Sequence, residues 1–131
     1  MADVIVLQVD EMEPMLGGVM RRARASLGVT SFGMQVEDLP GGTDFYPEHD
    51  ESAFGGQEEV YTALAGSATL VVDGDEHLLE PGVFARVGPG VRRRIVPGPD
   101  GVRVLALGGV PGTFAVHPWT ELGAPDPELP G

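Results

Sequence analysis

Hydrophobic residues in this chain occur in short runs that alternate with polar residues, and glycine or proline separates one run from the next. Such runs are typical of β-strands, because successive side chains of a strand point to opposite faces of the sheet. Evenly spaced short strands indicate a sandwich or a small barrel. The pattern therefore predicts an all-β fold, with strands over residues 4–9, 30–37, 59–65, 68–72, 76–79, 83–87, 91–96, 102–107 and 113–117.

One segment, residues 12–27, has a helical pattern, although two adjacent glycines weaken it. Gly28 is a suitable C-terminal cap, so we expect one short helix over residues 19–26. The strongest turn signal is Asp73-Gly74. It predicts a tight hairpin, because both central positions of such a turn need a positive φ.

The length of 131 residues fits a single domain with one core. We expect residues 1–29 to form an N-terminal strand and short helix that pack on the barrel, and residues 30–120 to form the barrel. Three prolines lie in residues 121–131. This C-terminal tail cannot extend a sheet, because proline lacks the amide donor that a strand needs.

The charge of the chain excludes several classes of partner. Twenty acidic residues face eight basic ones, all of them arginine, and the formal net charge is −12. Such a surface repels phosphate backbones and anionic lipids, so we expect no nucleic acid and no membrane as partner. No apolar run approaches the roughly 20 residues of a membrane span, and a cytoplasmic location is expected. The absence of cysteine excludes disulfides, thiol catalysis and zinc–thiolate sites.

The strand periodicity also identifies two charged residues, Glu59 and Arg93, as candidates for the interior of the barrel. Glu59 and Tyr61 share one face of their strand, and Arg93 lies between Val91 and Ile95 on a face that is otherwise apolar. If both faces point into one barrel, Glu59 and Arg93 become a buried or half-buried ion pair.

The segment that contains His49 and Glu51, followed by Glu59 and Gly66, resembles the first motif of the cupin superfamily. That motif has two histidines one residue apart, then a glutamate, and a glycine seven residues after the glutamate. Glu59 and Gly66 match this spacing, and the gap from Glu51 to Glu59 is longer than usual.

A second segment resembles the second cupin motif, with a glycine at Gly82, a turn at Pro89-Gly90 and Arg93 three residues later, where the family has a histidine. The resemblance covers residues 30–117. It implies a double-stranded β-helix, a jelly-roll-like barrel that is often a homodimer. Many cupins hold a divalent metal on three histidines and a glutamate.

Carried over to this chain, those metal positions are His49, Glu51, Glu59 and Arg93. Glu51 can bind a metal through oxygen, but Arg93 cannot, because it is a permanent cation without an acceptor. Two unit charges about 4 Å apart interact by roughly 4 kcal/mol at an effective dielectric near 20, and a divalent ion doubles this. An inward Arg93 therefore opposes a metal, while it stabilises Glu59 without one.

The first functional hypothesis is a small-molecule-binding protein without a metal or other cofactor, its pocket lined by His49, Glu51, Glu59, Tyr61 and Arg93. Arg93 would favour a carboxylate on the ligand, and the acids a hydroxyl or an amine. The second hypothesis is a metal-dependent oxygenase or isomerase, as in many cupins. It would hold one divalent transition metal on His49, Glu51 and Glu59.

Other interpretations of these residues stay open. His49 stands beside acidic residues and can be a solvated loop histidine, and Tyr61 can be barrel packing with a satisfied hydroxyl. The barrel can also have no ligand and act through sheet edges that pair with protein partners. The sequence does not decide whether the chain is an enzyme.

Overall fold

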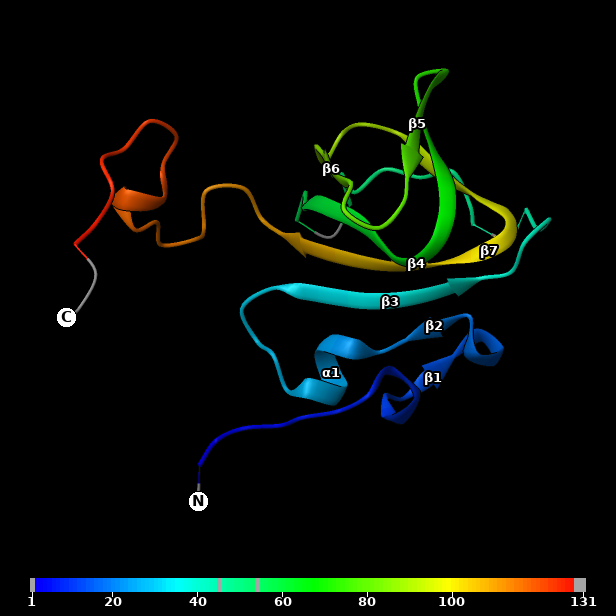
Figure 1. Cartoon of the computed structure of the whole chain (residues 1–131), viewed down its shortest axis with the longest axis horizontal. Helices are drawn as coiled ribbons and strands as arrows, with labels where there is room; N and C mark the ends of the chain where they lie inside the picture. Colours follow the sequence, from blue (N-terminus) through cyan, green and yellow to red (C-terminus); the bar gives the residue numbers. More distant parts are fainter. Residues whose placement is uncertain (1, 45, 54, 129–131) are drawn as a thin grey trace.

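Two long antiparallel strands, β4 (Glu58–Val72) and β7 (Arg93–Gly109), form the frame of the fold (Figure 1). The computed structural model describes residues 2–44, 46–53 and 55–128. The remaining strands of the described residues are β1 (Pro14–Met15), β2 (Met20–Arg21), β3 (Gly33–Leu39), β5 (Asp75–Leu79) and β6 (Phe84–Val87). The helix is α1 (Ala23–Leu27), and 3₁₀ turns lie at Val9–Glu11, Leu16–Gly18 and Pro118–Thr120.

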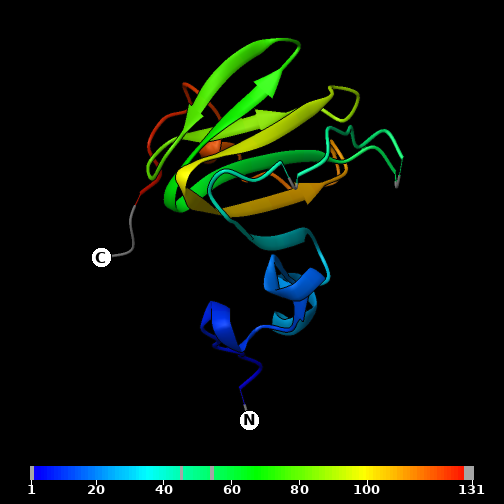
Figure 2. The same cartoon turned by 90° about the vertical axis from the view of Figure 1, so that its right-hand side faces the viewer.

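The strands form one sheet in the order β1-β2-β3-β7-β4-β5, and β6 pairs with the first part of β4. The register between β4 and β7 shifts twice, between Ala63 and Ala65 and between Gly66 and Ala68. Such irregularities bend a strand and increase its twist. Figures 1 and 2 show β4 and β7 curving so that β5 and β6 fold back over them. The predicted all-β, jelly-roll-like barrel is therefore confirmed.

The apolar core lies inside the curve of β4 and β7, where Tyr61, Leu70, Ile95 and Val104 are almost completely buried. A smaller apolar cluster joins Met12 and Ala23 to Val36 on β3. This cluster packs α1 against β3, and Figure 2 shows the N-terminal segment on the side of β3 away from β4 and β7. The helix ends at Leu27 with Gly28 as its left-handed cap, as predicted, but it has only five residues.

Two of the predicted strands are absent. Residues 4–9 and 113–117 carry no strand pairing, and Val6 and Phe114 are largely exposed. Their β-branched and aromatic residues fit a strand, but a strand needs a hydrogen-bonded partner strand, and among the described residues none pairs with them. The sequence also predicted two shorter strands in place of each of the long strands β4 and β7. The prolines and glycines of residues 97–101 form a corner within β7 instead of a loop.

Among the described residues, no helix is long and apolar enough to cross a membrane. The hairpin at Asp73-Gly74 is present, and both residues have positive φ, as the sequence predicted.

The close approach of β4 to β7 at Gly66 gives a first prediction. A Cβ at Gly66 would clash with the carbonyl oxygen of Gly101, and Gly66 has a φ of +73°. We expect Gly66→Ala to lower the free energy of unfolding by about 3 kcal/mol or more, because strain and a backbone clash add. The control is Gly74→Ala, which has a φ of +81° and no atom within 4 Å of its Cβ. It should cost only about 1–2 kcal/mol. Urea unfolding measures both, and equal losses would contradict the clash.

Candidate functional site

Backbone hydrogen bonds hold the segment with His49 and Glu51 against the start of β7. The amide of His49 donates to the carbonyl of Arg93 at 3.0 Å, and the amide of Arg93 donates back at 2.8 Å. The amide of Glu51 donates to the carbonyl of Pro89 at 2.8 Å. These bonds place the two side chains opposite Glu59 of β4, so residues from three parts of the sequence meet at one point.

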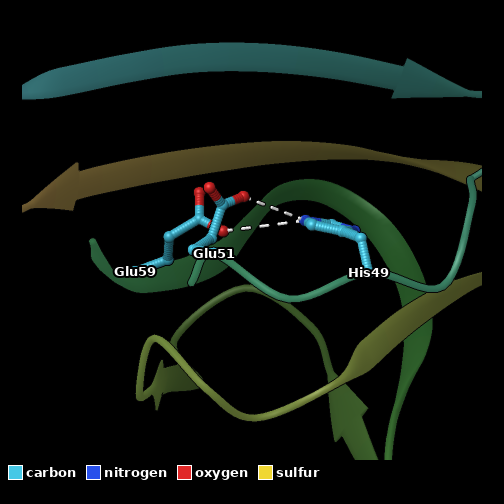
Figure 3. A group of neighbouring side chains, drawn as sticks. All are labelled: His49, Glu51 and Glu59. Atoms are coloured by element: carbon cyan, nitrogen blue, oxygen red, sulfur yellow. Dashed lines mark ion pairs between the residues drawn. The ribbon is translucent and has the colours of Figure 1, made fainter. Parts of the chain in front are cut away.

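His49, Glu51 and Glu59 converge (Figure 3). The Nε2 atom of His49 lies 3.1 Å from Oε1 of Glu51 and 3.9 Å from Oε1 of Glu59. One nitrogen or oxygen atom from each residue lies within 4.8 Å of the other two, and all three residues are partly buried. A nitrogen and two carboxylate oxygens at this spacing can hold a divalent cation or share protons.

The other ring nitrogen of His49 fixes the orientation of the imidazole. Nδ1 lies 3.1 Å from the carbonyl oxygen of Pro47, and a carbonyl only accepts, so Nδ1 carries the proton of this hydrogen bond. Nε2 then faces Glu51 at hydrogen-bond distance. Nε2 and the Oε1 atom of Glu51 lie 3.1 Å apart, close enough for a proton or a cation to bridge them.

Arg93 is completely buried and lies against Glu59. Its Nη1 donates to the carbonyl of Val91 at 2.9 Å, and its Nη2 lies 3.5 Å from Oε1 of Glu59. Nη2 and Nε have no hydrogen-bond partner among the described residues. The ion pair between Glu59 and Arg93 that the sequence predicted is therefore present. Within the described part of the chain, Arg93 makes no ion pair with Glu51, so its guanidinium does not separate the two carboxylates.

Tyr61 completes the surroundings of Glu59. Its hydroxyl donates to Oε1 of Glu59 at 2.6 Å and lies 3.4 Å from the hydroxyl of Tyr46. Burial raises the pKa of Glu59, and the Glu51 carboxyl raises it further, while the Tyr61 hydrogen bond and the Arg93 charge lower it. Burial also raises the pKa of both tyrosines, so their hydroxyls stay protonated donors at neutral pH.

Two cavities meet at this cluster, and Gln35, Glu51 and Glu59 line both. The larger has a volume of about 620 Å³ and extends towards Gln57 and Gly108. The smaller cavity, which we call the inner cavity, has a volume of about 290 Å³ and is bounded by the N-terminal segment, β3 and the segment with Tyr46 and His49. Its lining residues are Leu16, Val19, Met20, Gln35, Glu37, Leu39, Tyr46, Pro47, His49, Glu51 and Glu59. Arg93 and Tyr61 line neither cavity.

Sequence reasoning missed Glu37, which lies on β3 and has an exposed fraction of only 3%. Its Oε2 has no hydrogen-bond partner among the described residues. Burial raises its pKa to about 7, and the nearby charge of Glu59 contributes to this shift. Gln35 and Glu37 alternate with Met34 and Val36, a pattern that indicates a solvent-facing polar side. The apolar Leu39, two residues after Glu37 on the same face, was the one signal against that interpretation.

The fold resembles that of several solved cupins. A cupin protein from Bacteroides fragilis superposes with a TM-score of 0.67 at 22% identity, over 92% of this chain and 96% of that one. A cupin 2 conserved barrel domain protein from Salinispora arenicola gives a TM-score of 0.51 at 23% identity, over 60% of this chain and 63% of that one. These similarities confirm the fold that the two sequence motifs imply.

A third similar structure is the DMSP lyase DddQ from Ruegeria pomeroyi, with a TM-score of 0.54 and 26% identity over 70% of this chain. This chain spans 45% of the length of that lyase. No family model matches the chain, and no curated protein matches it in sequence.

The raised pKa of Glu37 predicts how stability depends on pH. Between its ordinary value near 4.5 and its folded value of about 7, the folded state keeps a proton that the unfolded state has lost. The free energy of unfolding therefore falls as the pH rises through this window, by up to about 3 kcal/mol for this group. Glu37→Gln removes the ionisation while keeping the size of the side chain. We expect it to match the parent near pH 4, below this window, and to be more stable at pH 8.

Chemical unfolding at several pH values measures this difference. The other titrating groups are common to both proteins and cancel to first order. A difference between the two proteins that stays constant with pH would contradict the burial of an ionisable Glu37.

Proposed function

The chain has the cupin fold, and we propose that it binds a small molecule in the cavities beside Glu51 and Glu59, without a catalytic metal. The observation that carries this proposal is the position of these two carboxylates, which lie on the wall shared by both cavities. Concave sites with a few convergent polar groups are the usual binding sites of folded domains.

The charge of Arg93 supports binding without a metal. Its guanidinium stands at the position of the last metal-binding histidine in the cupin motif and pairs with Glu59. A buried carboxylate needs a positive partner, and Arg93 supplies it. A divalent ion at Glu59 would lie close to this fixed positive charge, which opposes its binding.

The groups that face the cavities favour a hydroxyl or an amine on the ligand. Glu51, Glu59 and Gln35 offer acceptors to both cavities, whereas Arg93 is buried beside Glu59 and does not line them. The carboxylate on the ligand that the sequence suggested therefore has no support from the position of Arg93.

The alternative function is a metal-dependent cupin enzyme, and the His49 ring favours it. Nδ1 donates to a backbone carbonyl and Nε2 faces two carboxylates, which is the common arrangement of a metal-binding histidine. His49, Glu51 and Glu59 fit a divalent ion in donor type and convergence. Such an ion would supply Lewis-acid chemistry next to the larger cavity.

We also propose that the chain forms a homodimer. Large apolar side chains are exposed on β5 and β6, at Leu78 and Phe84, and on the C-terminal segment, at Phe114, Trp119 and Leu122. Exposed apolar groups in such number favour association. Light scattering should give twice the mass of one chain, and the mass of a single chain would contradict the proposal.

The experiment that separates the two functions is elemental analysis of protein purified without a histidine tag or chelator and dialysed against Mn, Fe, Ni and Zn salts. If the protein binds its ligand without a metal, the metal content should be well below one equivalent per chain. A small-molecule screen by NMR then follows on the parent, on Glu51→Gln and on the control Glu48→Gln, whose side chain is mostly exposed and lines neither cavity.

We expect ligands whose binding is lost in Glu51→Gln and kept in Glu48→Gln. Near one equivalent of metal that is lost in Glu51→Gln would replace the proposal by the enzyme alternative. Ligands that bind both variants equally well would place the binding site elsewhere.

A further inference from the structure

Glu37 is a buried carboxyl group that takes no part in the ion pair between Glu59 and Arg93. It lies in the middle of β3, and other acidic residues of the chain supply the negative charge of the protein surface. One of its oxygens is buried and has no hydrogen-bond partner in the part of the chain that the structure describes. Leaving such an oxygen unpaired costs about 1–3 kcal/mol, more for a charged group, so the fold alone gives no reason for a glutamate here.

The inner cavity is the place where Glu37 can find a partner. Three carboxyl groups line it, Glu37, Glu51 and Glu59, together with the imidazole of His49. Among the residues that the structure describes, no lysine or arginine lines it, and Arg93, which pairs with Glu59, is not part of its lining. The cavity is therefore a region of negative potential, which favours a cation.

The rest of the cavity wall indicates what kind of cation fits. Leu16, Val19 and Met20 of the N-terminal segment and Leu39 of β3 give it an apolar side. A metal ion or a hydrated inorganic cation gains nothing from these residues, whereas the hydrocarbon part of an organic cation does. The volume of about 290 Å³ limits the occupant to a small molecule.

We propose that the inner cavity binds the ammonium group of a small organic amine, that Glu37 is its principal anionic partner, and that Leu16, Val19, Met20 and Leu39 contact its hydrocarbon part. The inference rests on the proposed binding function and narrows it to one class of ligand. A charge-assisted hydrogen bond from the ammonium to Glu37 would satisfy the unpaired oxygen and offset the cost of burying it. Burial and the charge of Glu59 raise the pKa of Glu37, and a cation in the cavity would act in the opposite direction by favouring its charged form.

The test compares three probes of nearly equal size and different charge: n-butylamine, n-butanol and butyrate. Each is titrated at pH 8 into the parent chain, into Glu37→Gln and into the control Glu48→Gln, with amide chemical shifts as readout. Unfolding curves of each variant confirm that it is folded. We expect butylamine to bind the parent more tightly than the other two probes do. Its affinity should fall by at least about tenfold in Glu37→Gln and stay unchanged in Glu48→Gln.

Butylamine binding that is equal in the parent and Glu37→Gln would overturn the inference, as would preferred binding of butanol or butyrate at the cavity residues. In those cases the proposed binding function stands, because a ligand still occupies the cavity. If no probe, and no compound of the wider screen, shifts the amides of the cavity residues, the binding function fails together with the inference.

Discussion

The structure depends on one buried interaction, the guanidinium of Arg93 against the carboxylate of Glu59. An arginine with no exposed surface is tolerated only when its charge has a partner, since an unpaired ion in a protein interior costs several kcal/mol. Glu59 provides that partner from β4, and the backbone of Arg93 at the same time pairs with His49. Arg93 therefore joins β7 to Glu59 through its side chain and positions the loop that carries His49 and Glu51 through its backbone.

The balance of charge around this pair explains why the site suits a ligand. Among the described residues the Arg93 guanidinium forms an ion pair with Glu59 but not with Glu37 or Glu51, so the negative charge of these three carboxyl groups is only partly compensated. Burial raises the pKa of Glu37 to about 7 and raises that of Glu59 as well, so both groups keep a proton more readily than free carboxyl groups do. A positively charged ligand group would compensate the negative charge more completely, since it brings both charge and hydrogen-bond donors into the cavity. A stable interior without a ligand would need fewer acids at this place.

The sequence predicted the parts of this arrangement that local periodicity controls. Alternation placed Glu59 and Tyr61 on one face and Arg93 on an apolar face, and the pair that follows from these faces is present. Periodicity could not place Glu37, because its polar neighbour Gln35 makes that side of β3 resemble a solvent face. Glu37 lines its cavity together with residues of the N-terminal segment and of the loop with Tyr46, which lie outside β3 and are not visible to its periodicity. The same limit applies to residues 4–9 and 113–117, whose composition favours strands while no neighbouring strand is available.

The most direct test of the central interaction is a double-mutant cycle of Glu59→Gln and Arg93→Met, measured as the free energy of unfolding with a chelator present to exclude metal. Removing one member of a buried pair leaves the other unpaired, so each single change should cost about 3–5 kcal/mol. The double change removes both charges and should cost less than the sum by at least about 2 kcal/mol. Strictly additive losses would contradict the account, because they would mean that Glu59 and Arg93 do not stabilise each other.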